Sequence, residues 1–319
     1  MIMNDRSMAI AILCSHLCVS DGIIPLEPKE YSTFASILGA KGMNPEDLLS
    51  ISRQDLIQKL ELSEEQADRI LRLMDRSGSL SFEISKYESM GITLLTRADS
   101  AYPPNLKKKL KNACPPLFYT VGDLTLLDRN AIGYVGSRSI GDGDILFARD
   151  AVRKTVANGY SVVSGGAKGT DSIAEEEALL AGGTAIAFLS DSLLRKLRNS
   201  KTIQAVQEGK LVLLSVAKPD AGFNTGIAMM RNKYIYAQSE ATVVIKADYN
   251  KGGTWSGAVE NLNHRWALPL CWNHVSYPGN KALIEKGAIP VGEEWDGSLK
   301  SIMDKASQGE NEQLRFFET

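Results

Sequence analysis

Residues 160–171 have the sequence YSVVSGGAKGTD, in which a short apolar run leads through a glycine-rich turn into a stretch rich in alanine and glutamate. A short apolar run bounded by turn residues is typical of a buried strand. The alanine- and glutamate-rich stretch that follows is typical of a helix. The sequence therefore predicts a strand, a glycine-rich loop and a helix in direct succession.

Short apolar runs alternate with amphipathic stretches along the chain from Asn130 onward. Such alternation indicates βαβ units, in which parallel strands form a sheet with helices on both faces. We therefore expect an α/β fold. The predicted strands are residues 131–135, 160–163, 184–189, 211–214, 241–246 and 267–271.

The first 90 residues or so have a different pattern, with apolar positions at helical spacing in residues 10–19, 31–38 and 56–73. Ser63 followed three residues later by Gln66 is typical of a capping box, in which each side chain binds an orphan backbone amide of the helix start. This part of the chain is predicted to form a small helical module.

We predict three parts of the chain: the helical module over residues 1–90, the sheet domain over residues 91–294 and a tail over residues 295–319. The tail is polar and partly acidic, so it is either a docked short helix or a loose end. Phe316 and Phe317 favour docking, because two adjacent aromatic side chains gain stability by burial.

Composition excludes two classes of protein. The chain has 319 residues, of which 44% are hydrophobic and 23% charged, so it can bury a sizeable core and is not a disordered chain. It has 36 Lys and Arg against 38 Asp and Glu, a net charge of -2, which excludes a uniformly basic coat for nucleic acid. Any phosphate-binding surface must therefore be local.

The sequence carries no signal for export or membrane insertion. The four cysteines are scattered, without the spacing of metal ligands, and are expected to be free thiols. The N-terminus lacks a basic region followed by an uninterrupted apolar run, and no segment approaches the roughly 20 apolar residues that span a bilayer. We expect a cytoplasmic protein that does not contact membranes.

Ligands of parallel sheets collect outside the carboxyl ends of the strands. Three polar segments are predicted at that edge: two directly follow strands, and the third lies on a helix. Gly136 to Ser139 places Arg138, a planar fork of donors suited to phosphate, directly after the first strand. Ser164 to Asp171 combines glycines, Lys168 and a helix start. Arg231, Asn232 and Lys233 can bind phosphate, sugar or base edges.

Each of these segments also has a purely structural interpretation. Arg138 could pair with a neighbouring acid in a tight turn, and Asp171 could cap the helix that it begins. The Arg231 to Lys233 triplet could be a solvated helix face. In a fourth glycine cluster, over residues 251–257, Trp255 could stack on a base or pack against the sheet.

No arrangement of side chains indicates catalysis or a metal site. The loop over residues 164–171 has neither the GxxxxGK[ST] spacing nor the GxGxxG spacing of nucleotide-binding loops. His264 and His274 have no cysteine or acid at metal-ligand spacing. Ser164 lacks a nucleophile-elbow context and a histidine partner. We therefore predict no catalytic residues, no cofactor and no metal.

Six ordered motifs resemble the bacterial DNA-processing protein A family, also called Smf, within the larger set of Rossmann-like nucleotide- and ligand-binding domains. The resemblance covers about residues 91–291. The motifs are YPPNL at 102–106, PPLFYTVGD at 115–123, YVGSR at 134–138, VVSGGAKGTD at 162–171, RNKYI at 231–235 and PGNKALIEKGAIPV at 278–291.

The resemblance implies a helical module followed by an extended Rossmann-like domain with a parallel or mixed sheet, which binds single-stranded DNA in a positive pocket and forms a homodimer. Family members help to load a RecA-type recombinase onto single strands during natural transformation. The residues implied in nucleic-acid binding are Ser137 and Arg138 for phosphate, Ser164, Gly165, Gly166 and Lys168 for a nucleotide cradle, and Arg231, Asn232 and Lys233 for the rest of the pocket.

The chain departs from the family pattern at several positions. Glu175 stands where the family commonly has histidine, Ser215-Val216 where it often has Ser-Glu, and Lys233 where it usually has arginine. Residues 252–254 read GGT in place of SGS. The chain is also expected to lack the winged-helix domain that many members append. A divergent role, for instance in defence or on mobile elements, therefore stays open.

A second functional class also stays open, namely a nucleotide-binding sensor or an enzyme that cleaves nucleoside monophosphates. Related Rossmann-like folds use a glycine-rich loop and a nearby carboxylate for that cleavage, in a PGGxGTxxE pattern. Here Thr170 is followed by Asp171, Ser172 and Ile173, so the Gly-Thr-x-x-Glu part of the pattern is not met.

Overall fold

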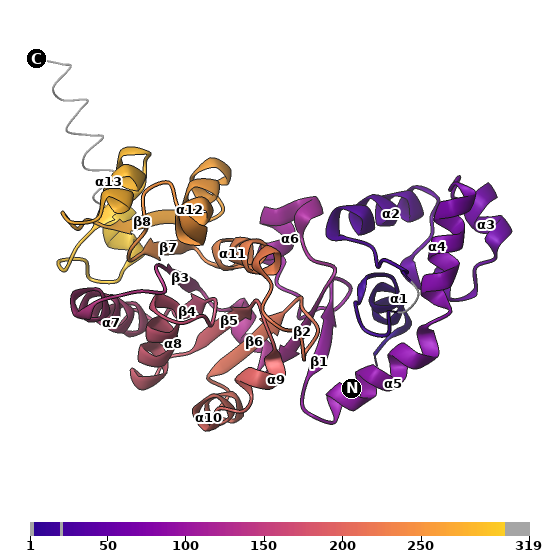
Figure 1. Ribbon diagram of the computed structural model, residues 1–319, viewed down its shortest axis with the longest axis horizontal. Coiled ribbons are helices and arrows are strands. Elements are labelled where there is room, and N and C mark those ends of the chain that lie inside the picture. Colours follow the sequence, from indigo (N-terminus) through magenta and orange to yellow (C-terminus); the bar gives the residue numbers. More distant parts are fainter. Residues whose placement is uncertain (1–2, 20–21, 304–319) are drawn as a thin grey trace, which may run out of the picture. The chain divides into compact units, whose positions relative to one another are not determined.

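A computed structural model describes residues 3–19 and 22–303. The described residues divide into two compact units, the first within Met1–Leu127 and Leu189–Ala228 and the second within Asp128–Phe188 and Met229–Thr319. Each unit contains helices and strands, so the α/β class predicted from the sequence is confirmed (Figure 1). The boundaries predicted near residues 90 and 294 describe a different division and stay a prediction.

The N-terminal part of the first unit is helical, as its apolar spacing predicts. Its elements are α1 (Asp5–Cys14), α2 (Pro28–Ala40), η1 (Pro45–Ser50), α3 (Arg53–Gln58), α4 (Glu64–Met74) and α5 (Ser77–Glu88). The capping box at the start of α4 is confirmed, because Ser63 and Gln66 each accept a hydrogen bond from the other residue's backbone amide. A local sequence pattern is therefore sufficient to define this helix start.

The rest of the first unit contains an antiparallel group of strands, in which β1 (Thr93–Thr96) pairs with β2 (Leu117–Val121), and β2 pairs with β6 (Leu211–Ser215). Gly122 ends β2 at φ 110°, where a Cβ would be 2.3 Å from the carbonyl oxygen of Leu211. The remaining elements are α6 (Pro104–Leu110), η2 (Lys111–Ala113), η3 (Leu124–Asp128), α9 (Leu193–Lys196) and α10 (Ser200–Gln207).

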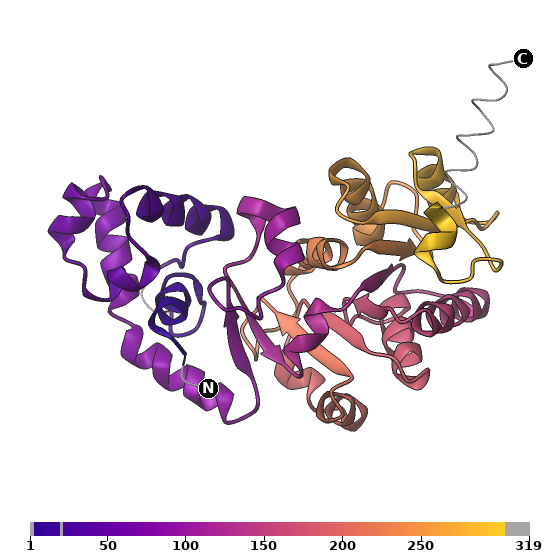
Figure 2. The ribbon, with the colours of Figure 1, turned by 180° about the vertical axis from the view of Figure 1, so that it is seen from behind.

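The second unit contains the predicted parallel strands, in the order β5-β4-β3-β7-β8-β9. Figure 1 shows α7 and α8 on one face of these strands and α11 and α12 on the other, and Figure 2 shows the same layers from behind. The strands are β3 (Ala131–Val135), β4 (Ser161–Ser164), β5 (Ala185–Leu189), β7 (Ala241–Val244), β8 (Leu268–Trp272) and β9 (Ile289–Val291). The helices are α7 (Asp142–Ala157), α8 (Thr170–Leu180), α11 (Thr225–Gln238), α12 (Gly252–His264) and α13 (Pro278–Glu285).

One hydrophobic core joins α7 and α8 to the strands, and Phe147 of α7 stacks on Trp272 of β8 with ring centroids 4.2 Å apart. Trp295, Leu299 and Ile302 also belong to this core, so the first part of the predicted tail packs against the second unit. Phe316 and Phe317, on which the prediction of docking rests, lie outside the described residues.

The described residues include no helix that is both long enough and apolar enough to cross a bilayer. All four cysteines are free, as their spacing predicts, and Cys14, Cys114 and Cys271 are buried. Burial raises the pKa of the Cys114 thiol, so this side chain stays protonated and acts as a small apolar group.

Candidate nucleic-acid interface

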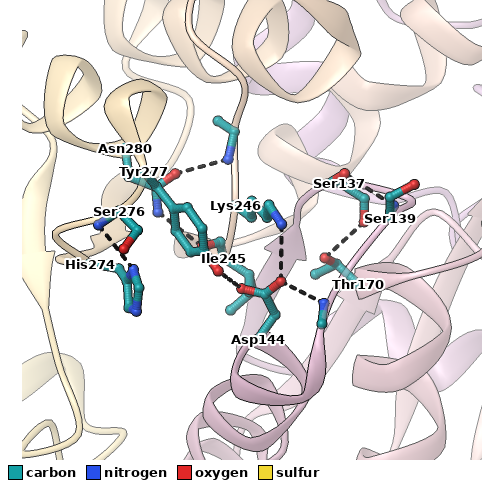
Figure 3. Close-up of polar contacts among 12 residues, drawn as sticks. Ser137, Ser139, Asp144, Thr170, Ile245, Lys246, His274, Ser276, Tyr277 and Asn280 are labelled. Carbon is teal, nitrogen blue, oxygen red and sulfur yellow. Dashed lines mark hydrogen bonds and ion pairs between the residues drawn. The ribbon is translucent and has the colours of Figure 1, made fainter.

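The loops that follow β3, β4 and β7 are joined through Ser137. Its backbone amide donates a hydrogen bond of 2.9 Å to the carbonyl oxygen of Lys246, two residues beyond the end of β7. Its carbonyl oxygen accepts hydrogen bonds from the amide and the hydroxyl of Thr170, the first residue of α8 (Figure 3). The carboxyl ends of these strands therefore form one continuous edge, as the strand order predicts.

Glycines allow two of these segments to touch. A Cβ at Gly136 would lie 2.3 Å from the Thr170 hydroxyl oxygen. Gly169 has φ 81°, and a Cβ there would lie 2.6 Å from the carbonyl oxygens of Ser137 and Arg138. Because only glycine fits at both positions, the backbone of Ser137 and Arg138 is held against the start of α8.

Arg231 projects from α11 beneath the loop after β4. Its side chain is 5% exposed, and its Nη1 lies 3.3 Å from the Asp171 carboxylate. Within the described part of the chain, its Nε has no hydrogen-bond partner. Burial lowers the pKa of the Arg231 guanidinium, while the Asp171 carboxylate opposes that shift. The result is a buried arginine with unused donor capacity.

Asp171 differs from its default interpretation as a helix cap. Gly169 is the N-cap residue of α8, without a side-chain capping bond, and the Asp171 carboxylate pairs with Arg231 instead. The reason is tertiary, because α11 brings a buried cation to a carboxylate 60 residues away in sequence. Local sequence favoured capping since it contains no information about that partner.

Ser164 supports the loop from below. It is fully buried, its hydroxyl donates to the Glu175 carboxylate at 3.4 Å, and it accepts a hydrogen bond from the Gly166 amide. Gly165 is buried over Arg231, and Gly166 has φ 63°, a conformation that favours glycine. Lys168 is exposed on the same loop. In this arrangement Lys168 faces solvent while Ser164 and Glu175 set the shape of the loop.

Asn232 and Lys233 connect α11 to α12. The Asn232 amide donates to the carbonyl oxygen of Gly253 at 3.3 Å, and the Lys233 ammonium lies 3.0 Å from the Glu260 carboxylate. Both side chains are half-buried, so they are not simply a solvated face. Trp255 of the same glycine cluster is buried and lies edge-on to Tyr249, which favours packing over stacking on a base.

The structure places all nine predicted binding residues in the second unit, at the end of β4, on the loops after β3 and β4 and on α11. Arg138 and Lys168 are exposed, whereas Ser164, Gly165 and Arg231 are buried. Lys246 is a cation at the same edge that motif reasoning missed. Its position at the end of a predicted strand was a usable signal, because the carboxyl-edge rule applies to every parallel strand. No group of three or more potential metal ligands occurs among the described residues.

A parallel sheet covered by helices on both faces, with glycine-rich loops at its carboxyl edge, defines a Rossmann-like α/β protein. The model of the DNA recombination-mediator protein A family matches residues 93–302, and the chain belongs to this family. The match confirms the family resemblance of the sequence motifs.

Two relatives of known name support this assignment. The chain is 26% identical over 245 residues to protein Smf of Escherichia coli, across 75% of this chain and 64% of Smf. It is 25% identical over 212 residues to the DNA processing protein DprA of Bacillus subtilis, across 65% of this chain and 71% of that protein. The chain therefore matches less than two thirds of the length of Smf.

Two solved structures share the fold. DNA processing protein A of Streptococcus pneumoniae superposes with a TM-score of 0.69 at 18% identity, over 91% of this chain and 95% of that chain. DNA processing protein A of Helicobacter pylori, which is described with a single-stranded DNA binding mode, superposes with a TM-score of 0.53 at 24% identity, over 68% and 96% of the two chains.

Proposed function

We propose that this DNA-processing family member binds single-stranded DNA at the carboxyl edge of the second unit's sheet and performs no chemistry on it. Backbone phosphates contact the exposed Arg138 and Lys168, and the Arg231 guanidinium adds positive charge from beneath Gly165. The observation that carries the proposal is the buried Nε of Arg231, which has no hydrogen-bond partner among residues 3–19 and 22–303, since a buried donor left unsatisfied is costly unless a ligand or water uses it.

Charge distribution supports a focused contact. A net charge of -2 gives the whole chain no general attraction for DNA. Glycines at positions 136, 165 and 169 bring the backbone of two loops and one helix start together, which suits close approach of a phosphate. The single-stranded DNA binding described for the Helicobacter pylori relative supports the same class of ligand.

Fluorescence anisotropy of labelled oligo-dT at increasing salt tests the proposal. If about three or four cations contact phosphates, log K should fall with log salt at a slope of roughly -2 to -3 for single strands. Absence of binding at low salt would overturn the proposal.

A matched pair of variants tests the location. Arg138→Ala should weaken binding by about 1.5–3 kcal/mol, the value of a hydrogen bond to a charged group. Arg129→Ala removes another exposed arginine, near the opposite end of β3, and should bind normally. Lys109→Ala provides a second control for diffuse charge. Equal losses in all three variants would contradict a site at the carboxyl edge.

The homodimer and the RecA-type recombinase partner belong to the same proposal. Light scattering during size-exclusion chromatography measures the dimer directly. The loading of a purified recombinase onto oligo-dT, with and without this protein, tests the recombinase partner. A protein that is monomeric over the whole concentration range would contradict the proposed homodimer. Recombinase loading that this protein does not change would contradict the proposed recombinase role.

The nucleotide-cleaving alternative requires a carboxylate that can reach the ligand. Asp171 pairs with Arg231, and Glu175 accepts a hydrogen bond from Ser164 beneath the loop. Both groups therefore have structural roles, which favours binding over cleavage. Release of base or ribose phosphate from a panel of nucleotides would instead support the enzyme.

A further inference from the structure

Four side chains beyond Arg138 form a connected cluster at the same edge, which we call the β7–β8 cluster: Asp144, Lys246, His274 and Tyr277. Figure 3 shows Tyr277 between Lys246 and His274, with Asp144 below Lys246 and Ser137 on the other side of Lys246.

Asp144 holds the cluster in place. Its side chain is 1% exposed, and its carboxylate accepts hydrogen bonds from the Gly141 amide, the Tyr277 hydroxyl and the Lys246 ammonium, the last at 3.3 Å. Burial by itself would raise the pKa of Asp144, but these hydrogen bonds outweigh burial and the pKa lies below its ordinary value. The carboxylate therefore stays charged and fixes the positions of Lys246 and Tyr277.

The aromatic part of the cluster is layered. The Lys246 ammonium lies 4.9 Å from the centroid of the Tyr277 ring, and the His274 ring stacks on Tyr277 at 4.4 Å and 25°. His274 is oriented further by a hydrogen bond from the Ser276 amide to its Nδ1 and by the Trp272 ring 4.5 Å away. His274 is half-buried and its neighbour Val275 is fully exposed, so this ordered stack reaches the surface.

The cluster continues the proposed interface along the sheet. The carbonyl oxygen of Lys246 accepts the hydrogen bond from the Ser137 amide, next to Arg138. Strands β3, β7 and β8 are consecutive parallel neighbours, so Arg138 and His274 follow strands about 10 Å apart at the same edge. An exposed cation followed by an aromatic stack is the combination that holds a single strand without sequence preference.

We propose that the single-stranded DNA path extends from Arg138 across Lys246 to His274, where Lys246 contacts a backbone phosphate and the His274 ring stacks on a nucleobase. This inference rests on the proposed function and adds a second subsite to it. Lys246 retains two N–H donors after its bond to Asp144, and 26% of its side chain is exposed, so a phosphate can approach it.

Oligo-dT of increasing length separates the two subsites in the full-length chain. Short oligonucleotides that fill only the Arg138 region should bind wild type and His274→Ala equally. For longer oligonucleotides, the dissociation constant of His274→Ala should be at least roughly fivefold higher than that of wild type, which corresponds to the loss of one stacked base. Lys246→Gln should reduce the salt slope for long oligonucleotides by about 0.7, the value of one phosphate contact.

Three further variants separate binding from folding. Lys286→Gln removes an exposed lysine at the other end of α13 and should leave binding unchanged. Lys246→Arg should restore the salt slope. Tyr277→Phe loses the hydrogen bond to Asp144 but keeps the ring, so it should lower thermal stability and retain binding.

The outcomes distinguish this inference from the function on which it rests. If wild type binds no oligo-dT, the proposed function fails. If Arg138→Ala weakens binding while Lys246→Gln and His274→Ala bind oligonucleotides of every length like wild type, the second subsite is overturned and the proposed function remains. If Tyr277→Phe and His274→Ala lose binding in proportion to their loss of stability, the cluster is structural only.

Discussion

Gly165 lies so close to the guanidinium of Arg231 that a Cβ on this glycine would be 1.4 Å from Nη1 and 2.5 Å from the Asp171 carboxylate. Glycine at this position is therefore required by packing against an ion pair, and the loop after β4 has its shape because α11 lies beneath it. This relationship connects the glycine-rich motif to a residue far away in the sequence.

Gly165→Ala should displace the Arg231 guanidinium from Asp171. We expect a loss of about 1–3 kcal/mol in the free energy of unfolding, the usual cost of overpacking, together with weaker oligo-dT binding. Chemical denaturation and anisotropy measure the two effects. Gly143→Ala is the matched control, because nothing lies within 4 Å of its added Cβ and alanine at a compatible site stabilises by about 0.4–1 kcal/mol.

Asp171→Asn should leave the Arg231 charge buried without its carboxylate. The Arg231 side chain is 5% exposed and the Asp171 side chain 10% exposed. Because both are nearly inaccessible to solvent, the expected loss in the free energy of unfolding is about 3–5 kcal/mol. Urea denaturation measures it. The double variant Asp171→Leu with Arg231→Met should recover much of the loss, and a double variant as unstable as Asp171→Asn would argue against the buried pair as the cause.

The Asp144 carboxylate should make the free energy of unfolding depend on pH in the acid range. Its folded-state pKa lies below the ordinary value of 3.8, so its stabilising effect is fully present above that value and is lost as pH falls through the folded-state pKa. Asp144→Asn should therefore be less stable than wild type at neutral pH, and the difference should shrink below about pH 4. Thermal unfolding of both proteins across that range measures the difference, and a gap independent of pH would contradict the role of the charge.

Trp295 should anchor the segment after β9 to the second unit. It is 3% exposed within the core that contains Phe147 and Trp272. Trp295→Ala should cost about 3–5 kcal/mol of the free energy of unfolding, the range for large aromatic side chains in cores. Met303→Ala, at a side chain that is 65% exposed, should change stability by less than about 0.5 kcal/mol. Equal effects would mean that the segment is held by other contacts.

The sequence predicted what depends on neighbours along the chain. The Ser63 capping box and the alternation of strands and helices after Asn130 are confirmed. The positions of Arg138 and Lys168 on loops after β3 and β4 follow from the same alternation, because loops at strand ends are specified locally. Family motifs then indicated the class of ligand.

Contacts between side chains that are far apart in the sequence could not be predicted in this way. The sequence favours Asp171 as a cap of α8, but its carboxylate pairs with Arg231, and Lys233 pairs with Glu260 on α12. The Lys246 contact with Asp144 joins residues 102 positions apart. Each of these pairings requires two elements to pack at a particular distance, which no local pattern encodes.

The sequence by itself therefore determined the succession of elements, the glycine-rich loops and the family, because periodicity, turn chemistry and ordered motifs are properties of short segments. Tertiary structure decided which charges are buried and which are exposed. Burial beneath Gly165 makes Arg231 part of an ion pair, while Lys168 remains in solvent. Packing of β7 against β3 and β8 decided that Lys246 and His274 extend the edge of Arg138, because neighbouring parallel strands end at the same side of a sheet.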